Sequence, residues 1–341
     1  MEQQVVGLLF GSFLVLLLIG APITVSLAGA AMAAFVVLGK NPISFVQIAF
    51  TSVGSFPLMA LPAFILAGAL MEAAGISKRL VDIAESLAGP ITGGMGAATI
   101  LACLFFSAIS GSGPATTAAV GMLMIPAMVK RHYDLSYASA VTASAGGLGI
   151  ITPPSIPLVI FGISALGMRP PAEAITMHGQ FSSVTISKLF IAGVVPGFIV
   201  ASSLLVMNYL VSKKHGYKGA DGDWNRAQLW LALRKGVWSI LAPVIILGGI
   251  YAGFFTPTES AVVAIFYTLF VGIFIHRELS FTKIFYALRT TTWLSGRVLL
   301  ILFAATVFGR LLVEQRIPAQ LAESIISWTD NVYIIWTVLI F

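Results

Sequence analysis

The sequence predicts an all-α polytopic membrane protein, and three observations lead to this fold class. Of its 341 residues, 58% are hydrophobic and only 9% are charged, whereas an ordinary soluble domain has about 25% charged residues. Apolar runs long enough to cross a bilayer as helices recur along the chain. Two further apolar regions are interrupted by Gly, Ser and Pro, and parts of the sequence repeat. Together these features predict an ion-transporter-like fold of inverted repeats, with a re-entrant helical hairpin and a broken helix.

The continuous apolar runs account for most of the predicted membrane spans. They lie at 5–20, 22–39, 52–74, 184–211, 238–254, 256–275 and 292–313, and a further run begins near 331. The segment 76–88 is different, because Leu80 and Ile83 share one helical face while Lys78 and Asp82 lie on the other. This pattern predicts a helix that lies along the membrane surface.

Two regions contain pairs of apolar halves that are each too short to cross the membrane comfortably. The halves within residues 93–130 lie on either side of the break in "SGSGPATTAAVG", and the halves within residues 136–167 lie on either side of the break in "GGLGIITPP". Basic residues such as Lys130 and Arg131 are typical of the cytoplasmic ends of membrane segments. We therefore expect 93–130 to enter and leave from the cytoplasmic side with its turn at 111–114, and the N-terminus to be periplasmic.

The two ends of the chain carry a weak internal repeat. The stretch "GAPITVSLAGAAMAAFVVLG" at 20–39 resembles "GFFTPTESAVVAIFYTLFVG" at 253–272. In the predicted topology the repeats run in opposite directions, which is the architecture of many secondary transporters. At the same shift a second hairpin would fall beyond residue 341, so we expect the chain to be a piece of a longer protein.

The repeat gives the predicted domain organisation. We assign 1–211 to the first inverted repeat, 212–237 to a cytoplasmic connector, and 238–341 to an incomplete second repeat. Within the first repeat, we expect scaffold spans within 5–74, an arm helix at 76–88, the hairpin and broken helix at 93–167, and a span at 184–211.

Charge and motif content exclude several classes of function. There are 19 Lys and Arg against 13 Asp and Glu; in a membrane protein this balance is typical of basic cytoplasmic loops, so we expect no nucleic-acid partner. The only cysteine is Cys103, which excludes an internal disulfide and a cysteine-based metal site. The sequence has no Walker A, HExxH or GxSxG motif, so we expect no enzymatic activity and no cofactor. Thr256, Pro257 and Glu259 in "TPTE" predict a capping box, a structural feature.

The two interrupted regions predict a binding site. Irregular backbone at membrane depth is tolerated only where it is buried in protein or lines a cavity. A broken helix leaves carbonyl groups free at one side of the break and N–H groups free at the other. Free oxygens suit a small hard cation such as Na⁺, and the N-termini of half-helices attract an anionic group of a substrate. The predicted Na⁺ ligands are Ser110, Ser112, Gly146, Gly149, Thr152 and Pro153, and the predicted substrate-binding residues are Gly113, Thr116, Pro154 and Ser155.

Each break also has a plainer interpretation. "SGSGP" can be a loop between two short helices, and "TPP" can be a proline kink. Two breaks close together in sequence, each between short apolar halves, favour the transport site over two unrelated irregularities.

Three long motifs resemble a known family. "AISGSGPATTAAVGMLMIPAM", "GGLGIITPPSIPLVIFG" and "GGIYAGFFTPTESAVVA" together resemble the large membrane (M) subunit of TRAP (tripartite ATP-independent periplasmic) transporters of the DctM type. The resemblance implies a Na⁺-coupled importer of an organic acid, of the sialic acid or C4-dicarboxylate class, with an elevator mechanism. It further implies a bacterial inner-membrane location, a small membrane subunit (Q) and a soluble periplasmic binding protein (P) that delivers the substrate. The "SGSGPATT" variant is most similar to sialic-acid members.

An alternative from another class is a membrane channel or a structural membrane subunit without coupled transport. A simple pore needs no pair of broken helices in inverted repeats, so this pair favours a carrier. In an elevator we expect 93–167 to move, because both breaks lie there, and the spans at 5–20, 22–39, 52–74, 238–254, 256–275 and 292–313 to stay fixed. An intramembrane enzyme is a third alternative, which the lack of paired His or Asp in the spans disfavours.

Overall fold

The computed structural model describes residues 2–54, 56–165, 184–219, 226–329 and 331–340. Within these residues every regular element is a helix, and no strand occurs. By length and apolar content, five of the described helical stretches can cross a membrane, or six if one interrupted pair counts as a single span. The all-α polytopic fold class expected from the sequence is therefore confirmed.

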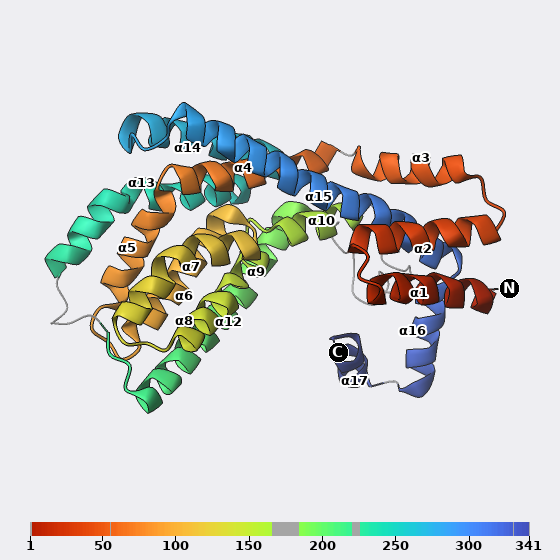
Figure 1. Cartoon of the computed structure of the whole chain (residues 1–341), viewed down its shortest axis with the longest axis horizontal. Coiled ribbons are helices and arrows are strands. Elements are labelled where there is room, and N and C mark those ends of the chain that lie inside the picture. The colour runs from red at the N-terminus through yellow and green to blue at the C-terminus, as the bar shows by residue number, and fades with distance from the viewer. Residues whose placement is uncertain (1, 55, 166–183, 220–225, 330, 341) are drawn as a thin grey trace. The chain divides into compact units, whose positions relative to one another are not determined.

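The chain forms two compact units, shown in Figure 1: Met1–Ser55 with Gly296–Phe341, and Phe56–Ser295. The first unit has a core of Ala and Phe side chains, in which Phe35 packs edge-on against Phe45 with ring centroids 5.7 Å apart. Lys40 forms an ion pair with Glu314 at its surface. Its helices are α1 (Glu2–Leu18), α2 (Ile23–Val37), α3 (Pro42–Val53), the second part of α15 (Phe281–Glu314), α16 (Ile317–Trp328) and α17 (Val332–Ile340).

The second unit contains both interrupted regions. Its elements are η1 (Phe56–Met59), α4 (Ala60–Ala73), α5 (Ile76–Ala88), α6 (Gly94–Ser110), α7 (Gly113–Lys130), α8 (Leu135–Gly146), α9 (Leu148–Ile151), α10 (Ile156–Ser164), α12 (Ile186–His215), α13 (Arg226–Tyr251), α14 (Pro257–Phe270), η2 (Val271–Ile275) and the first part of α15. One buried cluster lies among α4, α13 and α14, and a second lies among α6, α7 and α8. The capping box predicted at the start of α14 is confirmed, since Thr256 and Glu259 exchange side-chain and backbone hydrogen bonds.

The apolar run 52–74 is not the continuous helix that its composition predicts. Helix α3 ends at Val53 with Gly54 as its C-cap, a short 3₁₀ turn follows at Phe56–Met59, and α4 begins at Ala60. Pro57 lacks a backbone N–H and so cannot continue the hydrogen-bond ladder of α3. Hydropathy alone missed this interruption, because every residue around it except Gly54 and Ser55 is apolar or compatible with a span.

The amphipathic segment 76–88 forms the single helix α5. Its apolar face is buried against protein: Leu80 and Ile83 are each 1% exposed. Helix α13 approaches so closely that a Cβ added at Gly236 would lie 2.4 Å from Cδ1 of Ile83. Lys78 and Asp82 stay exposed on the opposite face. The apolar face of α5 is thus covered by neighbouring helices rather than left open.

Residues 93–130 fold as an antiparallel helical hairpin. The Thr99 hydroxyl lies 3.4 Å from Sδ of Met128 near one end, and the Ser110 and Thr116 hydroxyls are 2.9 Å apart at the other. The turn takes only Gly111 and Ser112. It is shorter than the predicted 111–114, because Gly113 and Pro114 already form the first turn of α7, where a proline N–H is not needed.

Candidate functional site

The first break is the tip of this hairpin. Gly111 adopts the left-handed conformation, with φ of +63°, which ends α6. Ser112 then caps α7, and its Oγ accepts a long hydrogen bond of 3.5 Å from the Ala115 N–H. Thr116 donates to the Ser112 carbonyl at 2.8 Å, which leaves Ser110 as the donor to Thr116. The tip therefore closes on itself through small polar groups.

The second break separates α9 from α10. Residues from Thr152 to Ser155 have no helical backbone, and Pro153 and Pro154 contribute no N–H. The Thr152 hydroxyl donates back to the Leu148 carbonyl, and the Ser155 hydroxyl donates to the Ile150 carbonyl. Ser155 also caps α10 by accepting from the Leu158 N–H at 3.4 Å.

The two breaks lie against each other. The Ile156 N–H, at the start of α10, donates to the Gly111 carbonyl at 3.1 Å. A Cβ added at Gly111 would lie 2.4 Å from the Pro154 carbonyl oxygen, and one at Gly149 would lie 2.7 Å from both the Ser112 carbonyl oxygen and Oγ1 of Thr116. These glycines let backbone meet backbone at distances that a side chain would forbid. In Figure 1, α9 lies beside the hairpin of α6 and α7.

The helix termini at this junction set its electrostatic character. The C-termini of α6 and α9, which carry partial negative charge, meet the N-termini of α7 and α10, which carry partial positive charge. None of the ten predicted site residues has an ionisable side chain. Ser110, Thr116, Thr152 and Ser155 are all at most 6% exposed. The junction can thus offer neutral oxygens to a cation and the partial positive charge of two helix N-termini to an anion, without a carboxylate or an ammonium group.

The two breaks differ in which oxygens remain available. At the hairpin tip, most hydroxyls are used within the turn, and Ser112, which is half-buried, keeps a hydroxyl hydrogen with no acceptor among the described residues. At the second break, the carbonyls of Thr152, Pro153 and Pro154 accept no hydrogen bond from any donor in the described parts of the chain. The tip offers a hydroxyl, and the second break offers main-chain carbonyls.

The structure brings together all ten residues that the sequence singled out. Gly146 and Gly113 belong to the same junction, because a Cβ added at Gly113 would lie 3.3 Å from the Gly146 carbonyl oxygen. Sequence reasoning missed Ser107, whose hydroxyl lies 2.6 Å from that of Thr152 and which is fully buried. Its position three residues before Ser110, on the same face of α6, was the available signal.

A known protein family matches nearly the whole chain. The family described as "Tripartite ATP-independent periplasmic transporter, DctM component" matches residues 10–341. The chain is 42% identical over 324 residues to the isethionate TRAP transporter permease protein DctMQ of Oleidesulfovibrio alaskensis, which covers 95% of this chain and 48% of that protein. It is 36% identical over 327 residues to the sialic acid TRAP transporter large permease protein SiaM of Vibrio cholerae serotype O1, covering 96% of this chain and 72% of the relative.

A third relative adds another substrate. The C4-dicarboxylate TRAP transporter large permease protein DctM of Rhodobacter capsulatus is 34% identical over 331 residues, covering 96% of this chain and 73% of that protein. The chain therefore spans about half the length of the isethionate permease and about three quarters of the other two. The substrates in the three names differ, although each is an organic acid.

Proposed function

This chain belongs to the TRAP transporter family as a DctM-type large permease subunit, and from this premise we propose that it is the ion- and substrate-carrying subunit of a Na⁺-coupled organic-acid importer. The observation that carries the proposal is the contact between the hairpin tip and the second break. A buried, uncharged junction of four helix termini matches the requirements of a site for a small cation and an anionic substrate.

The ion is proposed to bind on the oxygen-rich side of the junction. The candidate ligands are the Ser112 and Ser110 hydroxyls and the carbonyls of Gly146, Gly149, Thr152 and Pro153, with the Thr152 hydroxyl nearby. The Thr152 and Pro153 carbonyls lack a described donor, so they can bind a cation without breaking a hydrogen bond. Ion binding there would also join the two breaks, since it would draw ligands from both.

The anionic group of the substrate is proposed to bind at the N-terminal ends of α7 and α10, beside Gly113, Thr116, Pro154 and Ser155. These helix ends attract negative charge. The substrate is an organic acid, and relatives named for isethionate, sialic acid and C4-dicarboxylate define the set to test.

Movement of the site is proposed to follow an elevator mechanism. Residues 93–167 would move together, and the spans at 5–20, 22–39, 52–74, 238–254, 256–275 and 292–313 would stay fixed, with the small membrane subunit bound to them. The periplasmic binding protein would deliver the substrate. The single chain named DctMQ fits a close association between large and small permease components.

The test is uptake into proteoliposomes that contain the complete permease with its small subunit. Labelled sialic acid, a C4-dicarboxylate and isethionate are each supplied with the cognate binding protein, under an inward Na⁺ gradient or an equal K⁺ gradient. We expect one of these acids to accumulate, and only with both Na⁺ and the binding protein. Equal uptake in Na⁺ and K⁺ would exclude Na⁺ coupling. Conductive flux without the binding protein would favour the channel instead.

A further inference from the structure

A cavity of about 400 Å³ lies between α5, α13 and the end of η2, away from the helix breaks. We call it the basic pocket. The residues that matter for its chemistry are four cationic side chains, two carboxylates and one indole: Lys78, Arg79, Arg234, Lys235, Asp82, Glu278 and Trp238.

The charges in the basic pocket do not balance. Arg79 is satisfied, since it pairs with Glu278 at 2.8 Å and donates to the Gly75 carbonyl at 2.9 Å. Lys78, Arg234 and Lys235 form no ion pair with any described residue. Four cations facing two carboxylates leave an excess of positive charge, which favours an anionic ligand.

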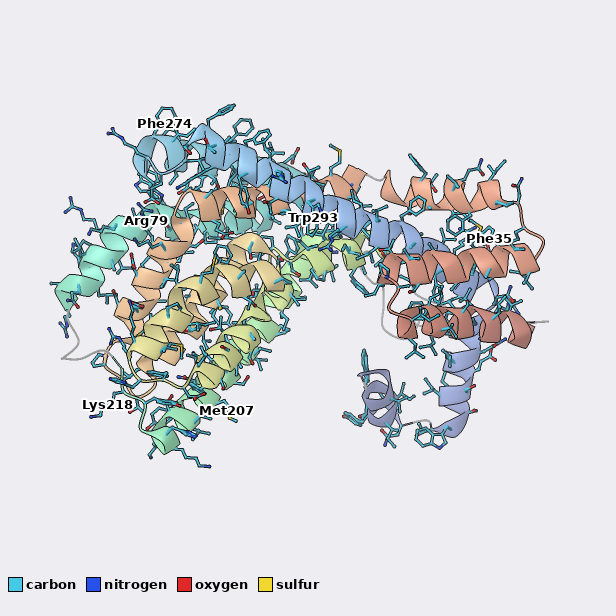
Figure 2. All side chains as sticks on the ribbon, viewed as in Figure 1. Phe35, Arg79, Met207, Lys218, Phe274 and Trp293 are labelled. Atoms are coloured by element: carbon cyan, nitrogen blue, oxygen red, sulfur yellow. The ribbon has the colours of Figure 1, made fainter. Side chains whose placement is uncertain are left out.

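The pocket also lies where several apolar stretches end. The apolar part of α13 begins at Trp238, η2 ends at Ile275, and α5 carries its charged residues on its exposed face. Phe274 precedes the pocket residue Ile275 in the chain and is 65% exposed, and Figure 2 shows it on the same side of the unit as Arg79. Tryptophan and basic side chains beside exposed apolar groups are typical of the boundary between lipid acyl chains and headgroups.

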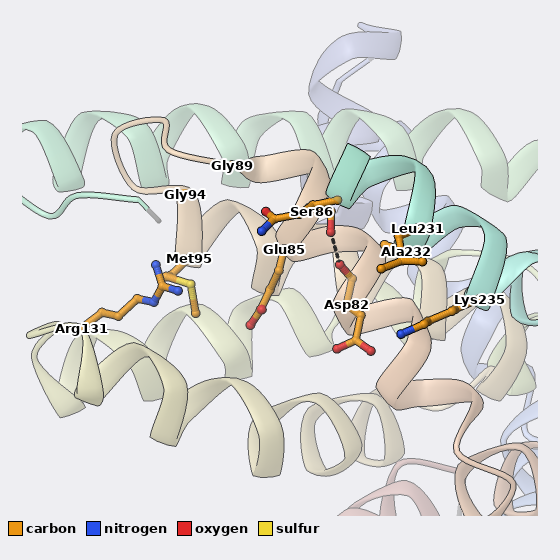
Figure 3. A pocket seen from close by; sticks show the side chains of 11 residues that line it. Asp82, Glu85, Ser86, Gly89, Gly94, Met95, Arg131, Leu231, Ala232 and Lys235 are labelled. Carbon is orange, nitrogen blue, oxygen red and sulfur yellow. Dashed lines mark hydrogen bonds between the residues drawn. The ribbon is translucent and has the colours of Figure 1, made fainter. Parts of the chain in front are cut away.

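A neighbouring cavity of about 360 Å³ provides an internal comparison (Figure 3). It shares Asp82 and Lys235 with the basic pocket, and its other charged residues are Glu85 and Arg131. Two carboxylates therefore face two cations there, and the charge is balanced. The excess of positive charge belongs to the basic pocket and is not a general property of this surface.

We propose that the basic pocket binds the phosphate group of an anionic phospholipid, held by Lys78 on α5 and by Arg234 and Lys235 on α13. The acyl chains would lie along the exposed apolar surface near Phe274. One phosphate contacting both helices would fix α5 to α13 at the membrane surface. This site goes beyond the proposed transport function and does not depend on it.

The experiment compares two triple variants of equal charge change. The test variant is Lys78→Gln/Arg234→Gln/Lys235→Gln, and the control is Lys213→Gln/Lys214→Gln/Lys218→Gln, whose lysines are exposed and do not line the basic pocket. The thermal midpoint of the purified, detergent-solubilised permease is measured while phosphatidylglycerol, phosphatidylcholine or inorganic phosphate is added. Native mass spectrometry counts the retained lipids.

We expect phosphatidylglycerol, but neither phosphatidylcholine nor inorganic phosphate, to raise the midpoint of the wild-type permease and of the control. The test variant should need roughly 10-fold more lipid for the same rise, because each basic side chain near an anionic surface contributes to binding. An equal effect in both variants would overturn the proposal, since it would indicate a nonspecific charge effect. A rise with inorganic phosphate that matches the one with lipid would assign the pocket to a free anion and overturn the lipid assignment.

Discussion

The tip and the base of the α6–α7 hairpin are built from opposite kinds of residues. The tip contains small side chains and hydroxyls around Gly111 and Ser112, without an aromatic ring. At the base, the Tyr133 and Tyr217 rings stack with centroids 4.5 Å apart. Buried Asn208 on α12 donates to the Gly93 carbonyl at 3.0 Å and accepts from the Tyr137 hydroxyl at 2.8 Å.

This difference separates a region suited to binding from a region suited to holding the hairpin in place. Stacked rings and a buried amide that both donates and accepts a hydrogen bond favour one arrangement, so the base resists change. At the tip, close glycine contacts leave no bulky side chain between the backbone oxygens and a ligand. We therefore expect substitutions at the tip to change transport, and substitutions at the base to change stability alone.

The largest effect is expected from Gly111→Ala. Alanine at a left-handed position costs about 1–2 kcal/mol, and here its Cβ would also lie 2.4 Å from the Pro154 carbonyl oxygen. Gly216 is a matched control because its φ is +72° and nothing lies within 4 Å of an added Cβ. Both variants should lose similar stability from backbone strain, but only Gly111→Ala should abolish uptake. Equal uptake in the two variants would mean that the contact between the breaks is not required for transport.

A cross-link that holds the tip against α4 should have the next largest effect. A Cβ added at Gly68 would lie 3.6 Å from Cβ of Ser110, within the range of a disulfide. If 93–167 moves past a fixed α4, oxidation of Gly68→Cys/Ser110→Cys should stop uptake, and reduction should restore the rate of the untreated double variant. Ser110→Cys alone controls for the loss of the serine. Full uptake by the oxidised pair, with the disulfide verified by mass spectrometry, would exclude the elevator.

A smaller, graded effect is expected from Ser112→Ala. It removes one neutral oxygen ligand, so the Na⁺ concentration for half-maximal uptake should rise about 2- to 10-fold, the equivalent of one ordinary hydrogen bond. It also removes the cap of α7, at a cost of about 1 kcal/mol. Thr185→Ala removes the cap of α12 and should lower stability similarly without changing Na⁺ dependence. If Ser110→Ala and Ser112→Ala both leave the Na⁺ dependence unchanged, neither serine hydroxyl binds the ion.

Only some of the features behind these predictions could be predicted from the sequence. The two breaks could be predicted because Gly, Ser and Pro cluster between apolar halves that are each too short for a span, and the turn at Gly111 follows from that chemistry. The interruption after Val53 was not predicted, although Gly54, Ser55 and Pro57 lie close together there, because long apolar runs on both sides are also compatible with one kinked span. Hydropathy reports the length of a span and not the continuity of its backbone.

Contacts between segments that are far apart in the sequence could not be predicted either. No local pattern indicates that Ser107 meets Thr152, or that Asn208 reaches Gly93, because each pair is separated by tens of residues and joined only by the fold. The sequence likewise predicted an amphipathic helix at 76–88 but not that α13 would cover its apolar face. An apolar face must be buried, and its partner is decided by tertiary contacts.

The smallest effect is expected at the base, from Tyr133→Phe. The Tyr133 hydroxyl donates to the Lys218 carbonyl at 2.8 Å, and its loss should cost about 1 kcal/mol with no change in Na⁺ dependence.

Burial raises the pKa of Tyr133 from 10.0 to about 12, so the folded state holds the proton more tightly than the unfolded chain does. The stability that this hydroxyl contributes is therefore complete below pH 10 and is lost as the pH rises from 10 to about 12. Judged by denaturation midpoints, the wild type should thus be more stable than Tyr133→Phe at pH 8, and this advantage should shrink as the pH rises above 10 and disappear before pH 12. A constant difference across that window would show that the hydroxyl does not titrate as a buried group, and a changed Na⁺ dependence would contradict the separation of tip from base.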